Sequence, residues 1–213
     1  MKKTIFAKLA IFILLLFLVG ISINIEFSSN NFNEDLGYNL NSSGSWTLSP
    51  MVIDDTGIGD YTWAQAFLQA WCSGAGTPGS PYIIEDVTID ALGVGSCLTI
   101  SNSNKSFIIR NCTFLNSGSG TGTPPYDGGI ILNGVTNGEL INNTCSSNSY
   151  GISMYYTDGV IIEQNIFTSN LKGLGMVTCQ FNEIYNNTFD NNDLGFSLTS
   201  EAQSNEIMYF FFF

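Results

Sequence analysis

Positive charge and histidine are the scarcest features of this sequence. Only 6 of the 213 residues are lysine or arginine, against 18 aspartates and glutamates, and there is no histidine. So few cations argue against a nucleic-acid partner, because hardly any side chains remain to displace counterions from phosphates. Without histidine, the chain lacks the commonest general base and the commonest transition-metal ligand. The formal net charge is −12 at pH 7, and the length suits one domain with an accessory segment.

Cysteine is also too sparse for a dense disulfide framework. The chain has five cysteines, an odd number, and none stands in the C-x-x-C spacing of a zinc site. We therefore predict no bound metal and no cofactor. Cys72 and Cys97 flank the region interpreted below as an N-terminal cap, so they are a candidate disulfide, with the unbridged state as the alternative.

The N-terminal segment predicts export. Lys2, Lys3 and Lys8 lead into a long apolar stretch, so residues 1–25 are interpreted as a signal peptide. No A-x-A cleavage site follows, and the alternative is an uncleaved helix that anchors the chain in a membrane. Residues 26–45 are polar and low in complexity, which is typical of a flexible linker. We expect the rest of the chain to be secreted or held at the cell surface.

Residues 46–95 combine a strand pattern with a short helical pattern. Residues 46–53 predict a first strand, and three aromatic residues after it recur at helical spacing, on one face. These residues are Trp63, Phe67 and Trp71. Thr62 and Gln65 form a capping box at the start of the predicted helix, and Gly74 supplies a stop. We interpret this region as an N-terminal cap and a first coil.

Residues 96–213 are a series of repeats. From residue 129 the period is 22 residues, and an earlier copy is followed by an insertion at residues 118–127. The segments open at Gly129, Gly151, Gly173 and Gly195. A fixed period of this size indicates a solenoid. The predicted inward columns are Ile130, Ile152, Leu174 and Phe196; Leu132, Met154, Met176 and Leu198; Leu140, Ile162 and Ile184; and Cys145, Phe167 and Phe189.

Apolar residues within each repeat lie two apart, which is the period of strands. Short strands separated by Gly, Asn and Ser do not suit a sheet of hairpins at this spacing. If each repeat instead makes one turn of three short strands, equivalent strands stack in parallel about 4.8 Å apart. We expect about five such coils. The glycine at each repeat start then lets the backbone pass where a Cβ would crowd it.

Two columns of asparagine follow the same period. Amides one strand spacing apart can donate to and accept from one another, so we predict hydrogen-bonded ladders that also satisfy buried turn carbonyls. The ladder residues are Asn143, Asn165 and Asn187, and Asn148, Asn170 and Asn192. The alternative is that asparagine only tolerates left-handed turn conformations.

The pattern G-I-x-L…I-x-x-N-x-F-x-x-N resembles the right-handed parallel β-helix. It is similar to the pectin-lyase-like superfamily and to the NosD-type β-helix family of archaeal and bacterial surface proteins, over residues 46–209. The resemblance implies an all-β, right-handed parallel β-helix with a short N-terminal capping helix, preceded here by the signal or anchor helix. It does not specify function, because this fold carries lyases, hydrolases, adhesins and accessory proteins.

Catalysis is not predicted for this chain. Lyases on this fold need acidic residues for Ca²⁺ and a cationic base, and hydrolases need paired carboxylates. Glu139, Glu163 and Glu183 lie near one edge, as a solvated acidic face or as a loose Ca²⁺ site. A fragment of a polysaccharide lyase or glycoside hydrolase stays as an alternative. The NosD resemblance implies copper-site maturation, but Met154 and Met176 fall in an inward column and histidine is absent.

The favoured hypothesis is an exported surface module that is structural or that recognises glycans. Exposed aromatic residues could stack on the sugar rings of a cell-envelope polysaccharide, and another surface protein is the other candidate partner. The candidate residues are Tyr155, Tyr156, Phe181, Tyr185 and the Pro124-Pro125-Tyr126 loop. The sequons suit an exported surface and give candidate glycosylation sites at Asn41, Asn104, Asn111, Asn142 and Asn186.

The C-terminus departs from the repeat. The copy that opens at Gly195 is one residue longer, and the chain then reads Met208-Tyr-Phe-Phe-Phe-Phe213 where an asparagine is expected. A solenoid needs a polar cap at each end. We therefore interpret the repeats as incomplete, in a fragment or frameshifted product of a longer β-helix. The alternative is that the phenylalanine tail inserts into a partner or a membrane.

Overall fold

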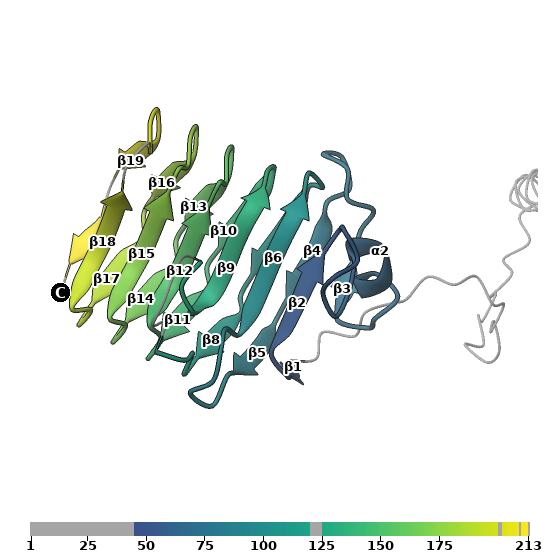
Figure 1. The fold of residues 1–213 in the computed structure, drawn as a ribbon, viewed down its shortest axis with the longest axis horizontal. Coiled ribbons are helices and arrows are strands. Elements are labelled where there is room, and N and C mark those ends of the chain that lie inside the picture. The colour runs from purple at the N-terminus through teal and green to yellow at the C-terminus, as the bar shows by residue number, and fades with distance from the viewer. Residues whose placement is uncertain (1–44, 120–124, 200–201, 209, 213) are drawn as a thin grey trace, which may run out of the picture. The chain divides into compact units, whose positions relative to one another are not determined.

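The structure is a computed structural model that describes residues 45–119, 125–199, 202–208 and 210–212. The described chain coils into three sheets that form the walls of the coil, and each of the six coils adds one strand to each sheet, with β1 and β3 as additional first strands of two sheets (Figure 1). Sheet B, with six strands, contains β2 (Met51–Asp54), β6 (Leu98–Ser103), β9 (Gly128–Val135), β12 (Tyr150–Tyr155), β15 (Lys172–Val177) and β18 (Leu194–Thr199).

Sheets C and A have seven strands each. Sheet C contains β3 (Cys72–Ser73), β4 (Tyr82–Glu85), β7 (Phe107–Arg110), β10 (Gly138–Ile141), β13 (Ile161–Glu163), β16 (Glu183–Tyr185) and β19 (Glu206–Met208). Sheet A contains β1 (Trp46–Leu48), β5 (Val87–Asp90), β8 (Thr113–Leu115), β11 (Thr144–Ser146), β14 (Ile166–Thr168), β17 (Thr188–Asp190) and β20 (Phe211–Phe212). We number six coils by their sheet B strands, where about five were expected.

The register follows the 22-residue period. Ile152 pairs with Leu174 in the next coil, and both strands run parallel, as do all neighbours except β3 and β4. The insertion at residues 118–127 leaves this register intact, because Thr113 in coil 2 still pairs with Thr144 in coil 3. Residues one repeat apart in the sequence therefore lie directly above each other in the coil.

The predicted inward columns form the core. Their members in coils 3 to 5 are at most 2% exposed, which includes Met154, Met176 and Cys145 at 0%. Coil 6 differs: Leu198 pairs with Met176 but is 48% exposed, and Phe196 is only half-buried. The prediction of a buried core residue is wrong for Leu198, because the described chain has no coil that packs on its far side, whereas Phe196 pairs with Leu174 and packs against the core.

The repeat-start glycines are required by close packing rather than by a left-handed backbone. A Cβ on Gly129 would lie 2.8 Å from the carbonyl oxygen of Gly151. A Cβ on Gly151 would meet the carbonyl of Gly173 and the ring of Phe167. The predicted crowding at these positions is therefore present. Gly195 occupies the equivalent position in β18.

The N-terminal end is covered by the short helix α2 (Trp63–Ala66), whose predicted capping box is present. Trp63 is fully buried between Tyr82 and Phe107, with ring centroids 5.0 and 5.4 Å away. The predicted three-ring helical face is wrong. The helix ends at Ala66, and its C-cap residue Phe67 is 45% exposed. Trp71 is buried, but it lies in the irregular segment after the helix.

The first predicted strand and the helix stop also need correction. Residues 46–53 form two strands in different sheets, because Ser49 and Pro50 turn the chain from β1 into β2. Gly74 does have a left-handed conformation, with φ +95°, but it follows β3 and does not end the helix.

The predicted disulfide between Cys72 and Cys97 is wrong, since all five cysteines are unbridged and buried. Cys72 lies in β3 and pairs with Ile84 in sheet C. Cys97 precedes β6 of sheet B, and its thiol donates to the carbonyl of Leu115, 3.2 Å away. The two side chains thus pack at different walls of the coil.

The predicted signal or anchor and nearly all of the predicted linker lie outside the described residues. Within the described ranges, no helix has the length and apolar character needed to cross a membrane.

Candidate functional site

The corners between sheets are held by the predicted amide ladders. Asn143 donates its side-chain amide to Asn165 Oδ1 at 3.0 Å and to the carbonyl of Ile109 at 2.8 Å. Asn165 repeats the pattern with Asn187 and with the carbonyl of Leu140. All three asparagines are fully buried. These bonds decide between the two interpretations of the column: the amides bond up the stack.

The second ladder lies at the corner between sheets A and B. Asn148 accepts at Oδ1 from the backbone of Ser117, and its own backbone donates to Asn170. Asn170 donates in turn to Asn192 Oδ1 at 2.8 Å. The left-handed residues at these corners are the neighbours of the ladder, such as Ser147 with φ +56°. At each corner, one residue thus adopts the left-handed conformation and the asparagine next to it makes the hydrogen bonds.

A third ladder, at the corner between sheets B and C, escaped the sequence analysis. Asn182 is fully buried and donates to Asn205 Oδ1 at 2.9 Å and to the carbonyl of Thr157 at 2.9 Å. The two asparagines stand 23 residues apart in the sequence, because the last repeat is one residue longer. A search that allowed this extra residue would have found the pair.

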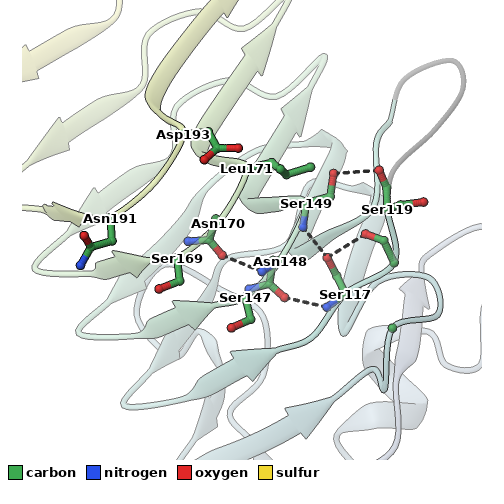
Figure 2. A pocket seen from close by; sticks show the side chains of 12 residues that line it. Ser117, Ser119, Ser147, Asn148, Ser149, Ser169, Asn170, Leu171, Asn191 and Asp193 are labelled. Carbon is green, nitrogen blue, oxygen red and sulfur yellow. Dashed lines mark hydrogen bonds between the residues drawn. The ribbon is translucent and has the colours of Figure 1, made fainter.

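A shallow groove runs along the outside of the second ladder (Figure 2). It has a volume of about 570 Å³ and crosses several coils rather than following one strand. Its walls repeat from coil to coil, with Ser147, Ser169 and Asn191 exposed at equivalent positions. The lining residues are Gly93, Ser117, Gly118, Ser119, Ser147, Asn148, Ser149, Ser169, Asn170, Leu171, Asn191 and Asp193. The lining is thus mostly hydroxyl and amide groups, with one carboxylate.

Tyr150 directly follows Ser149 of the groove and belongs to a group of tyrosines on and around β12, which we call the tyrosine cluster: Tyr126, Tyr150, Tyr155 and Tyr156. The rings of Tyr126 and Tyr150 stack with centroids 5.2 Å apart and planes inclined by 2°. Lys172 donates from Nζ to the Tyr150 hydroxyl at 2.8 Å. A Cβ on Gly175 would strike the Tyr150 ring, so the glycine leaves room for this ring over coil 5.

The outer part of the cluster is more accessible. Tyr155 and Tyr156 meet edge to face, with centroids 4.4 Å apart, and Tyr156 is 56% exposed. A hydrogen bond with Tyr156, burial, and the nearby Tyr156 and Tyr126 hydroxyls raise the pKa of Tyr155. The Tyr155 hydroxyl therefore remains protonated and can donate a hydrogen bond at neutral pH.

The structure separates the predicted sugar-stacking residues into groups. Tyr126, Tyr155 and Tyr156 come together, whereas Phe181 is 65% exposed at the corner that follows β15. Tyr185 lies in sheet C, and Pro124 falls outside the described residues. Tyr150 was missed, because nothing in the repeat pattern shows that this side chain crosses to the next coil.

The acidic residues do not form a metal site within the part of the chain that the structure describes. Glu163 instead pairs with Tyr185 in the next coil of sheet C, and Glu139 and Glu183 lie in the same sheet. A hydrogen bond to Glu163, burial and these three charges raise the pKa of Tyr185 to about 12. Asp54 accepts from Asn102 at 2.9 Å, so this carboxylate supports the first coils.

The candidate glycosylation sites in the described chain are all exposed. They are Asn104, Asn111, Asn142 and Asn186, and Asn41 lies outside the described residues. Asn111 and Asn142 occupy adjacent coils, and the amide of Asn142 donates to Asn111 Oδ1 at 2.9 Å.

Comparison with protein families matches residues 69–208 to the right-handed β-helix region, which is more than half of the chain. The chain belongs to the right-handed β-helix family. The match covers every complete coil of this β-helix from coil 2 to coil 5, including the groove and the tyrosine cluster. No curated protein and no solved structure matches it significantly.

Proposed function

We propose that this β-helix is an exported cell-surface module that binds polysaccharide without cleaving it. The observation that carries the proposal is the position of the tyrosine cluster, whose Tyr150 begins β12 and directly follows Ser149 of the polar groove. Tyrosines offer apolar ring faces with a polar tip, which suits the mixed surface of a sugar. The groove adds hydroxyl and amide groups that donate and accept hydrogen bonds.

The charge of the site favours a neutral glycan. Asp193 is the one charged residue in the groove lining, and Lys172 is engaged with Tyr150. The net charge of −12 would repel a polyanion. Export is supported by the basic and apolar N-terminal segment and by the four exposed sequon asparagines.

Binding is favoured over catalysis because acidic side chains that could serve as catalytic groups make structural contacts instead. Asp55 accepts from the backbone of Trp63 at 3.1 Å, and Glu85 forms an ion pair with Arg110 at 2.6 Å. Both carboxylates are thus used in structural contacts. Copper handling, as in NosD-type proteins, has little support, since Met154 and Met176 are fully buried. A pectin-lyase-like ancestry is compatible with a binding role on the same coils.

A glycan array on the full chain tests the proposal, followed by calorimetry with the best neutral glycan. We expect Tyr156→Ala and Tyr126→Ala to weaken binding about tenfold or more, because each removes a stacking surface. Phe67→Ala is the matched control, an exposed ring on the N-terminal cap, and should bind normally.

The outcome that would contradict the proposal is the absence of binding to any envelope glycan by a correctly folded chain. Appearance of unsaturated sugars or new reducing ends on incubation would instead favour the lyase or hydrolase alternative. Equal loss of binding in Phe67→Ala would show that the tyrosine cluster is not the site.

A further inference from the structure

Sheet A carries a column of threonines on its outer face, which we call the threonine column. Its strands pair in register, so each member lies directly above the member in the neighbouring strand. The members are Thr47, Thr88, Thr113, Thr144, Ile166 and Thr188, and Phe211 follows in β20. Hydroxyl and methyl groups therefore repeat along this wall at the strand spacing of about 4.8 Å.

The column faces outward, because the next residue of each strand faces the core. Ile89, Phe114 and Phe167 directly follow members of the column and are fully buried. The threonines of β5 to β17 are half-buried, Thr47 is exposed, and Ile166 is 42% exposed. Within the described residues, the hydroxyls of the column make no hydrogen bond to other groups of the chain. They are therefore available to an external partner.

Strand propensity alone does not explain the column. Threonine is favoured on half-exposed strand faces in general. However, the strands of sheet C have equivalent outward positions and contain no threonine. Candidate glycosylation does not explain it either, since Thr47 and Thr88 do not complete a sequon. The threonines are thus concentrated on one wall for a reason that neither feature supplies.

The wall around the column carries little charge. The second outward column of sheet A has uncharged side chains in coils 2 to 4, with Asp90 and Asp190 on either side of them. Asp90 accepts a hydrogen bond from Asn116 at 3.0 Å, and Asp190 accepts one from Asn191 at 2.9 Å. The outward positions of β5 to β17 hold neither an aromatic ring nor a cation. This wall therefore lacks the rings that stack on sugars and the cations that attract polyanions.

The spacing of the column fits a partner that is itself periodic. Hexagonal ice repeats its oxygen atoms at a spacing close to that between neighbouring strands. The hydroxyls can donate to and accept from water at each repeat, and the methyl groups restrict the orientation of the water beside them. Ladders of like side chains also oppose the twist of a sheet, so the wall stays nearly flat, as contact with a crystal face requires.

We propose that the outer face of sheet A, centred on the threonine column, binds ice. This inference goes beyond glycan binding and does not depend on it, because the tyrosine cluster lies on and around β12 of sheet B. Ile166 in coil 4 is the one position between Thr47 and Thr188 where the hydroxyl is missing.

Partitioning of the full chain into a slowly growing ice crystal tests the proposal. The chain is made in a host without N-glycosylation, since a glycan on Asn142 would lie beside the column. We expect enrichment in the ice, and Thr144→Lys should reduce it about fivefold or more, because a strongly hydrated ammonium interrupts the contact. Thr77→Lys is the matched control, an exposed threonine between β3 and β4, and should partition like the wild type.

Ile166→Thr tests the role of the spacing in the opposite direction. It supplies the missing hydroxyl at an exposed position, so enrichment in ice should rise about twofold. Circular dichroism checks that each variant is folded. A lower enrichment for Ile166→Thr would contradict the proposal, since the regular hydroxyls would then not be what contacts the ice.

Exclusion of the wild-type chain from ice, to the same extent as Thr144→Lys, would overturn the proposal. Binding to particles of crystalline polysaccharide that Thr144→Lys abolishes, without enrichment in ice, would also overturn it and assign the column to a glycan. Tyr156→Ala should weaken binding to the soluble glycan and leave the ice fraction unchanged, so the two proposals fail separately.

Discussion

Coil 5 and coil 6 of this β-helix have nearly the same sequence pattern, but they bury their apolar side chains to very different extents. Met176 and Leu198 occupy one column and pair directly, yet Met176 is fully buried and Leu198 is 48% exposed. The difference is a neighbour on the far side. In a one-dimensional stack, a residue is buried by the coils on both sides of it, and its own identity does not decide the matter.

The first coil of the described chain is covered by a non-repeating element. There the chain interrupts the repeat between β2 and β4 and places α2 over the end, with Trp63 fully buried. Two features hold the helix in place. The capping box fixes the start of this very short helix, and Trp63 stacks on the rings of Tyr82 and Phe107.

The amide ladders offer the strongest test of this contrast. Asn165→Ala, in the middle of a ladder, should lower the free energy of unfolding by about 4 kcal/mol, because Asn143, Leu140 and Asn187 lose their hydrogen bonds to the Asn165 side chain at once. Asn192→Ala, at the end of its ladder and half-buried, should cost about 2 kcal/mol. Urea denaturation measures both. Equal costs would show that the amides do not act as a stack.

In the apolar columns, a substitution in coil 5 should likewise lower the free energy of unfolding more than one in coil 6, with smaller losses than in the ladders. Met176→Ala removes a fully buried side chain and should cost about 3 kcal/mol through lost burial and a residual cavity. Leu198→Ala should cost about 1 kcal/mol, since half of this side chain already contacts water. Urea denaturation measures both losses, and a larger loss for Leu198→Ala would contradict the difference in burial between the two coils.

Buried thiols make the first two coils sensitive to alkali. Burial raises the pKa of Cys72 and of Cys112 to about 12, from an ordinary value of 9.0. Because the folded chain holds these protons more tightly, stability is complete below pH 9 and is lost as the pH rises toward 12.

A single variant isolates this effect. Between pH 8 and about pH 10, the wild-type chain should lose about 1 kcal/mol more stability than Cys112→Ala, since one raised thiol has been removed. Comparing the two pH values within each variant cancels the cost of the substitution itself. Identical losses in the two proteins would exclude a contribution from this thiol.

The smallest effect is expected on the outer surface. Glu85 and Arg110 form an ion pair at 2.6 Å, but their side chains are 37% and 41% exposed. Glu85→Gln should therefore change stability by about 0.5 kcal/mol, and added salt should reduce the difference. Thermal denaturation at low and high salt measures it. A change as large as that of Met176→Ala would mean that the outer face contributes as much as the core.

Much of the fold could be predicted because it is periodic. A repeat of 22 residues places Ile152 on Leu174 regardless of the rest of the chain, and the ladders follow from the same arithmetic. The cap could not be derived this way. Its aromatic spacing matches a helix over three turns, but the chain leaves the helix after Ala66 because β3 must reach sheet C.

The candidate site was only partly visible in the sequence. Aromatic type and polarity pointed to Tyr126, Tyr155 and Tyr156, which do lie together. The role of Tyr150 and the position of the groove could not be predicted. Both depend on the direction in which outward side chains extend across neighbouring coils, and the repeat pattern does not specify that direction. The third ladder was hidden by one additional residue between Asn182 and Asn205.

The insertion at residues 118–127 has a consequence for how such molecules change over time. Strand pairing resumes on its far side with Thr113 opposite Thr144, so a corner can gain residues while the walls keep their alignment. Tyr126, which comes from this added segment, stacks on a ring contributed by the next coil. A surface ring contact can thus be added by lengthening one bend, while the strands on both sides of it keep their pairing.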